Sequence, residues 1–142
     1  MCDFCDNNIL QKQSLFFNDI AGFIYPRKPV IFGHVMLVPK RHVEYFYDLT
    51  DIEIIEMRNL IKKLFEGFKN IHHATGFNLF TNNGQKADQH IPHVHWQIFM
   101  RFNNEKYSPY DVLNGKIDRE NISSLDKEWE KRKDRIAKLI KH

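Results

Sequence analysis

The chain of 142 residues is 42% hydrophobic and 27% charged, with a formal net charge of +3. This composition is typical of one globular domain and excludes a disordered protein. No apolar run is long enough to cross a bilayer, and no basic segment followed by an apolar one opens the chain, so we expect a cytoplasmic protein without a membrane partner. Basic residues gather in 127–141 but alternate with acidic ones, which indicates a solvated helix face, so a nucleic-acid partner is not expected.

Both cysteines lie at the N-terminus, as Cys2-x-x-Cys5. In a reducing compartment this spacing indicates a metal knuckle or a redox pair rather than a structural disulfide. A redox pair normally opens a helix after a buried strand, and nothing precedes this one, so a metal site is the better interpretation. Such a site needs two further ligands from elsewhere in the fold.

Two short strands joined by a turn are expected at 15–17 and 23–25, where apolar runs flank Asn, Asp and Gly. The segment 33–39 is predicted to be the next strand. It contains His34, which is either a satisfied core histidine or a group that orients a catalytic residue. His42 follows the end of this strand and is interpreted as a metal ligand or a surface residue.

A long amphipathic helix is predicted to begin at Thr50, because Thr50-x-x-Glu53 has the reciprocal pattern of a capping box. Apolar residues then recur at spacings of three and four, which is the stripe of a helix that covers a sheet. They are Ile54, Met57, Ile61, Leu64, Phe68 and Ile71. Gly76 is expected to end the helix.

The stretch from Gln89 to Phe99 is expected to be the strand that carries chemistry, paired with a strand at 77–81 through a polar loop. Successive side chains of a strand point to opposite faces. One face would hold His93, His95, Gln97 and Phe99, and the other Val94, Trp96, Ile98 and Met100. Near neutral pH, histidine can be a nucleophile, an acid, a base or a metal ligand, so the first face is the candidate site.

After Phe102 the chain is expected to be polar and irregular until about Asn121. Residues 123–126 offer a cap for a last helix, which would pack on the domain edge or on a second subunit. Its apolar residues are Leu125, Trp129, Ile136, Leu139 and Ile140. We interpret 1–142 as a single domain, with a motif-bearing core at 1–102 and a C-terminal extension at 103–142.

Several segments, in this order along the chain, resemble the histidine triad (HIT) family. They are 33–42, Asn82-x-Gly84, Gln89 and His93-Val94-His95-Trp96-Gln97, and the similarity covers about residues 2–102. The resemblance implies an α+β fold, with an antiparallel sheet of about five strands flanked by one long helix and a C-terminal helix, and a homodimer. It also implies hydrolysis or transfer of nucleoside monophosphate groups from a nucleotide or dinucleoside polyphosphate substrate.

The same resemblance implies roles for individual residues. His95 would be the nucleophile that attacks the α-phosphorus to give a covalent nucleotidyl-histidine, and His34 would belong to the supporting hydrogen-bond network. Asn82, Gly84 and Gln89 would lie near the phosphate. No magnesium is required if side chains and backbone N–H groups supply the positive potential.

The third motif position departs from the triad, because Gln97 replaces a histidine. This variant resembles the branch of galactose-1-phosphate uridylyltransferase and the diadenosine polyphosphate phosphorylases, which transfer a nucleotidyl group to a phosphate acceptor. Glutamine can donate to a phosphate oxygen but cannot titrate, and both hydrolysis and transfer stay open. Pro26 stands where relatives often place an acidic or amide side chain on the ribose, so the base is left undefined.

The resemblance to that branch implies a structural zinc ion in a closed set of four ligands. The ligands would be Cys2, Cys5, His42 and His93. Two alternatives stay open. One is a catalytic zinc held by His90, His93 and His95, and the other is a zinc-stabilised nucleotide-binding or interaction module without catalysis.

Overall fold

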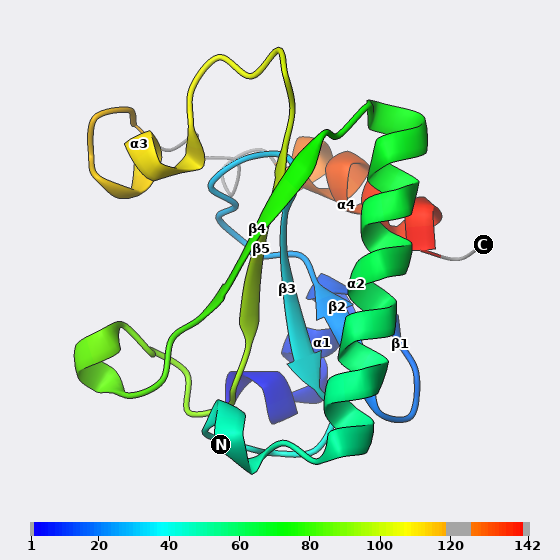
Figure 1. The fold of residues 1–142 in the computed structure, drawn as a ribbon, viewed down its shortest axis with the longest axis vertical. Coiled ribbons are helices and arrows are strands. Elements are labelled where there is room, and N and C mark those ends of the chain that lie inside the picture. Colours follow the sequence, from blue (N-terminus) through cyan, green and yellow to red (C-terminus); the bar gives the residue numbers. More distant parts are fainter. Residues whose placement is uncertain (1, 119–125, 141–142) are drawn as a thin grey trace.

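The computed structural model describes residues 2–118 and 126–140, and a five-stranded antiparallel sheet lies at its centre (Figure 1). The strands are β1 (Ser14–Phe17), β2 (Ala21–Ile24), β3 (His34–Pro39), β4 (Gly76–Thr81) and β5 (Trp96–Arg101). Their order across the sheet is β1-β2-β3-β5-β4. The predicted α+β fold class is confirmed.

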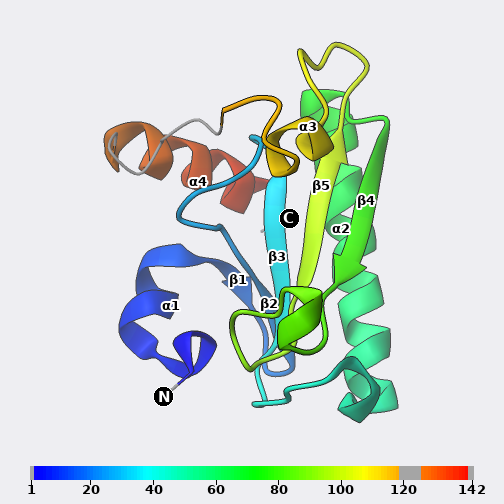
Figure 2. The same ribbon diagram turned by 90° about the vertical axis from the view of Figure 1, so that its left-hand side faces the viewer.

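Helices and 3-10 turns cover both faces of the sheet. They are η1 (Asp3–Cys5), α1 (Asn7–Gln13), η2 (Phe46–Asp48), α2 (Asp51–His72), η3 (Gln85–Ala87), α3 (Pro109–Leu113) and α4 (Asp126–Ile140). The long helix α2 lies along one face, and η1 and α1 lie on the opposite side (Figure 2). No described helix is long and apolar enough to span a membrane.

Alternate residues of the central strands pack into different apolar clusters. Val35 and Leu37 of β3 join Ile98 of β5 and the buried residues of α2 in the main core. Met36 and Val38 of β3 point the other way and pack against Phe4 of η1. The period of two therefore divides each strand between two layers.

The helix α2 begins as predicted but ends earlier. Thr50 and Glu53 form both hydrogen bonds of the capping box. The helix ends at His72, and His73 adopts the left-handed conformation (φ 61°) and caps it by donating its backbone N–H to the Phe68 carbonyl. The expectation that Gly76 ends the helix was wrong, because Gly76 already pairs with Arg101 as the first residue of β4.

The buried stripe of α2 is rotated from the predicted one. Met57, Leu64 and Phe68 are buried as expected, together with Leu60. Two predicted members of the stripe, Ile54 and Ile71, are 43% and 63% exposed. Spacings of three and four residues define one face of a helix. In α2 two neighbouring faces carry apolar residues at these spacings, and the face that includes Leu60 is the one that is buried.

The strand predicted to run from Gln89 to Phe99 is shorter than expected, since β5 begins only at Trp96. Before it, Val94 donates its backbone N–H to the Val43 carbonyl at 2.6 Å instead of continuing the ladder with β3. The alternation of faces nevertheless persists, because Val94 belongs to the main core. His93 and His95 therefore lie on an extended segment that leads into the strand.

The segment after Phe102 was wrongly expected to be irregular throughout, because it contains α3. Ser108 caps this helix, and Asp111 completes a capping box. Residues 123–125, the start of the predicted cap of the last helix, lie outside the described residues.

The C-terminal helix α4 packs on α2 and β1 of the same chain. Trp129 is fully buried, and its Nε1–H donates to the Pro26 carbonyl at 3.0 Å. A Cβ atom added at Gly67 of α2 would lie 2.9 Å from the Leu139 carbonyl oxygen, so glycine permits the close approach of the two helices.

Candidate active site and metal centre

The His95 side chain is buried, with 7% of its surface exposed, just before β5. Its Nδ1 lies 2.9 Å from the His93 carbonyl oxygen. A carbonyl oxygen only accepts, so Nδ1 carries the proton and Nε2 keeps its lone pair in the neutral ring. The pKa of His95 is lowered overall, mainly by burial and also by nearby His90. The hydrogen bond to the His93 carbonyl acts in the opposite direction but is outweighed. The neutral imidazole is thus the favoured form.

His34 and Gln97 are joined across neighbouring strands on the same face. The backbone N–H of Val30 donates to His34 Nδ1 at 3.0 Å. This bond leaves the proton of the neutral ring on Nε2, which donates to Gln97 Oε1 at 2.5 Å. Since the amide oxygen is occupied by His34, the amide NH₂ group of Gln97 is the end available to other acceptors.

The loop residues predicted to bind phosphate hold the loop in shape. Gln89 is buried, its Oε1 accepts from the Gly84 backbone N–H at 2.7 Å, and its amide NH₂ donates to the Glu44 carbonyl at 2.8 Å. Asn82 donates to the Asp88 carbonyl at 3.5 Å. Gly84 has φ +96°, which favours glycine. Among the described residues, these bonds connect the loop to itself and to Glu44 rather than to the His95 ring.

Two contacts of His95 were missed by the sequence reasoning. Thr81 Oγ1 donates to the His95 carbonyl at 2.9 Å and fixes its backbone. The ring of Phe4 lies edge-on to His95, with the centroids 5.1 Å apart. The only sequence signal for Phe4 was an aromatic residue between the two cysteines, where a simple metal knuckle needs none.

A cavity of about 360 Å³ opens on the same side of the sheet as Phe4. Its apolar wall is formed by Phe4, Ile9, Met36, Ile91 and Pro26. Its polar lining residues are Asp3, Lys12, Gln13 and Arg27. Met36 is the partner of Gln97 in the β3–β5 register, so one lining residue of the cavity is a cross-strand neighbour of Gln97.

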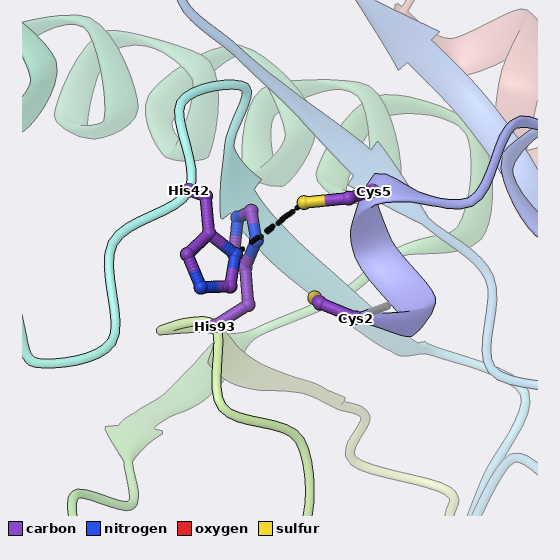
Figure 3. A group of neighbouring side chains, drawn as sticks. All are labelled: Cys2, Cys5, His42 and His93. Carbon is purple, nitrogen blue, oxygen red and sulfur yellow. Dashed lines mark hydrogen bonds between the residues drawn. The ribbon is translucent and has the colours of Figure 1, made fainter.

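The predicted metal ligands come together from three separate segments (Figure 3). The ligand atoms of Cys2, Cys5, His42 and His93 all lie within 4.8 Å of one another. Cys5 Sγ lies 3.4 Å from His42 Nδ1 and 3.6 Å from His93 Nδ1. Zinc bonds of about 2.3 Å to sulfur and about 2.0 Å to nitrogen in a tetrahedron separate the two ligands by roughly 3.5 Å. These distances fit a tetrahedral zinc ion.

The surroundings of the cluster prepare its ligands for a cation. His93 Nε2–H donates to the Pro39 carbonyl at 2.8 Å, which directs the lone pair of Nδ1 towards Cys5. Such a bond to a carbonyl commonly orients a metal-bound histidine. Burial and the neighbouring Cys2 raise the pKa of the Cys5 thiol, an effect that a bound cation opposes. Burial also lowers the pKa of His93, which favours the neutral ligand.

The alternative arrangement of His90, His93 and His95 around one metal is not formed. Within residues 2–118 and 126–140, one group of histidine, cysteine or acidic side chains is close enough to share an ion. It consists of Cys2, Cys5, His42 and His93. His90 is exposed, and Nδ1 of His95 is bonded to the His93 carbonyl.

Comparison with known proteins gives the same family along most of the chain. Residues 9–104 match the HIT domain. An uncharacterized HIT-like protein of Methanocaldococcus jannaschii is 31% identical over 104 residues, which are 72% of this chain and 80% of that protein. The adenosine 5'-monophosphoramidase hnt1 of Schizosaccharomyces pombe is 32% identical over 92 residues, which are 65% of this chain but only 61% of that protein.

Among solved structures, a zinc-bound histidine triad family protein from Mycobacterium smegmatis shares the fold. Its TM-score is 0.68 at 21% sequence identity, and the match covers 97% of this chain and 94% of that one.

Proposed function

Because the chain belongs to the HIT domain family, we propose that it is a nucleotide-processing enzyme that acts through a covalent nucleotidyl-His95 intermediate. Its proposed substrates are dinucleoside polyphosphates and nucleotide conjugates. The observation that carries the proposal is the Nδ1–H bond from His95 to the His93 carbonyl, which leaves the lone pair on Nε2. A buried, neutral and fixed imidazole is a competent nucleophile towards phosphorus.

In the proposed reaction, the lone pair of His95 Nε2 forms a bond to the α-phosphorus as the bond to the leaving group breaks. The leaving group departs with that electron pair. Water, which gives up a proton to the solvent, or a phosphate oxygen then attacks the same phosphorus, the phosphorus–nitrogen bond breaks, and its electrons return to Nε2. Throughout, Nδ1 keeps its proton, held by the His93 carbonyl.

Gln97 is proposed to bind a phosphate oxygen through its amide NH₂ group, with His34 as the residue that positions it. The His34 Nε2–H bond to Gln97 Oε1 supports this orientation. Glutamine cannot deliver a proton. A polyphosphate leaving group departs as an anion and needs none, whereas an amine does, so Gln97 favours dinucleoside polyphosphates over phosphoramidates.

The cavity lined by Phe4, Ile9, Met36 and Ile91 is proposed to receive the nucleoside, because its wall is largely apolar, Met36 is the cross-strand neighbour of Gln97, and Phe4 contacts the His95 ring. Asn82, Gly84 and Gln89 are proposed to shape the loop near the phosphate. No magnesium is assigned to the reaction.

Zinc is proposed as the ion held by Cys2, Cys5, His42 and His93. When bound, it supplies a closed structural link between the N-terminus and the segment that carries His95. No step of the proposed reaction passes through it.

The proposed function is tested by mixing the zinc-loaded protein with diadenosine tetraphosphate or adenosine phosphoramidate, each with and without inorganic phosphate. Release of AMP indicates hydrolysis, and formation of ADP only in the presence of phosphate indicates transfer. Intact-mass measurement after rapid quenching is expected to show a nucleotidyl adduct that His95→Ala lacks. Tight nucleotide binding without either product would instead support a non-catalytic binding module.

We also propose that the protein forms a homodimer through β4, an edge strand of the sheet. Phe77 and Leu79 on this strand are 38% and 40% exposed. With Phe46, Ile54 and Trp96, among others, they line an apolar cavity of about 320 Å³. Light scattering is expected to give a dimer for the wild type and a monomer for Leu79→Lys. Ile55→Lys, at an exposed residue of α2 outside this cavity, is the matched control that stays dimeric; a monomeric wild type would refute the dimer.

A further inference from the structure

Phe4 connects the metal centre to the candidate nucleophile. It is 5% exposed and lies in η1, between the two cysteine ligands. Its ring is edge-on both to His93, at a centroid distance of 5.7 Å, and to His95, at 5.1 Å. One side chain therefore touches a metal ligand and the ring proposed to react.

The position of Phe4 depends on how the N-terminal segment is attached. Between Cys2 and Lys12, the described backbone hydrogen bonds are internal to the segment, apart from the one that Ser14, the C-cap of α1, donates to the Leu10 carbonyl. Among residues 2–118 and 126–140, its side-chain hydrogen bonds to the rest of the protein are those of Cys5 with His42 and His93. Apolar packing is the remaining attachment, so the metal ligands are the main polar link between this segment and the sheet.

The same segment forms one wall of the cavity that is proposed to receive the nucleoside. It contributes Asp3, Phe4, Ile9 and Lys12, whereas Met36 and Ile91 come from the rest of the fold. The main core against α2 contains no residue of this segment. Detachment of the segment would therefore open the cavity while the sheet and α2 keep their packing.

We infer that the metal centre controls the nucleotide site through Phe4. Ligation of Cys2 and Cys5 seats the Phe4 ring against His95 and closes the cavity wall, so the zinc-loaded protein binds a nucleoside monophosphate more tightly than the metal-free protein. Phe4 would contact the nucleoside as part of the cavity wall, and it would also position the His95 ring. The inference rests on the proposed function in assigning this cavity to the nucleoside.

The test compares the full chain with and without zinc, using AMP as the probe. Calorimetry measures AMP affinity, and NMR of histidine-labelled protein measures the His95 ring resonances, with His34 as an internal reference. Removal of zinc is expected to weaken AMP binding by roughly tenfold or more and to shift the His95 resonances, while far-UV circular dichroism stays close to that of the loaded protein.

Variants separate the role of Phe4 from general stability. Zinc-loaded Phe4→Ala is expected to retain its metal by native mass spectrometry but to show the weak AMP binding and the His95 resonances of the metal-free protein. Phe4→Tyr keeps the ring and is expected to restore both. Leu10→Ala removes apolar packing from the same cluster but no contact with His95, so its His95 resonances are expected to match those of the wild type.

The inference is overturned if AMP affinity and the His95 resonances are unchanged in folded metal-free protein. It is equally overturned if zinc-loaded Phe4→Ala and Leu10→Ala give the same AMP affinity and the same His95 resonances. This comparison uses only zinc-loaded proteins, so it can be made even if the metal-free chain unfolds. If the zinc-loaded wild type neither binds AMP nor turns over any nucleotide, the proposed function fails instead, and the His95 resonances alone decide whether Phe4 transmits the state of the metal.

Discussion

The two faces of the central sheet differ in packing and in hydrogen bonding. On the face towards α2, Val94, Ile98 and Met100 are fully buried in one continuous apolar core. On the opposite face, His95 and Gln97 alternate with them and form directed hydrogen bonds. Because the strand period is two, one short stretch places one set of side chains in the core and leaves the other set for the proposed chemistry. Substitutions on the two faces should therefore affect different measurements.

The largest effect is expected from His95→Ala on the chemical face. Removing a covalent nucleophile commonly lowers kcat by about 10⁴-fold or more. The midpoint of urea unfolding should change much less, because the main core is untouched. Steady-state turnover of diadenosine tetraphosphate together with urea titration checks both expectations, and turnover by the variant near the wild-type level would refute the proposed role of His95.

A smaller loss is expected from Gln97→Glu, which keeps the shape of the side chain but replaces the amide donor with a carboxylate. The negative charge repels the phosphate, and loss of a donor to a developing charge commonly costs about 10²–10³ in kcat. Turnover of the same substrate measures the loss. Full activity would mean that the amide NH₂ group does not contact the transferred phosphate.

Leu64→Ala on the opposite side of the sheet is expected to affect stability instead of turnover. Leu64 is fully buried in the main core, and such truncations cost about 2–5 kcal/mol in the free energy of unfolding. The kcat of the protein that stays folded should be unchanged. A large fall in kcat at unchanged stability would contradict the division of roles between the faces.

The smallest effect concerns Glu53 at the start of α2. Burial would raise its pKa, but hydrogen bonds from Arg41 and Thr50 outweigh burial and hold the pKa below the usual glutamate value. A lowered pKa in the folded state stabilises the protein fully above the unfolded pKa of about 4.3. That contribution is lost as the pH falls below this value.

Urea unfolding of the wild type and Glu53→Gln over a range of acidic pH tests this expectation. Glutamine keeps the geometry of the capping box without the charge, and the difference between the two proteins cancels the titration of the metal ligands. The stability advantage of the wild type should shrink on acidification. An advantage that is constant or grows would contradict the lowered pKa.

The features of the site that could be predicted from the sequence are those specified by a short sequence pattern. Alternation from His93 to Met100 predicted the two faces, and the Cys2-x-x-Cys5 pair with the family resemblance predicted the four side chains that form the candidate metal cluster. The HIT-like fold followed from the same segments. These features depend on residues that are close in sequence or belong to a shared motif.

The parts that were missed depend on where distant segments meet. The contact of Phe4 with His95 requires the N-terminal turn to dock on the sheet, and the bond from Thr81 to the His95 carbonyl requires the register of β4 with β5. Ile54 and Ile71 were misassigned because spacing defines a helix face only to within about one residue. His73 caps α2 in the left-handed conformation, whereas the sequence pattern had favoured a stop at Gly76.

The bond from Trp129 to the Pro26 carbonyl connects the candidate site to a helix outside residues 9–104, the part of the chain that matches the HIT domain. Trp129 lies on α4, outside residues 9–104, and the Arg27 guanidinium stacks over its ring at 4.8 Å. Pro26 and Arg27 line the cavity proposed for the nucleoside. The C-terminal helix thus contacts two residues that line this cavity. If the cavity receives the nucleoside as proposed, a homologue with a different C-terminal helix is expected to differ in nucleoside preference while keeping every motif residue.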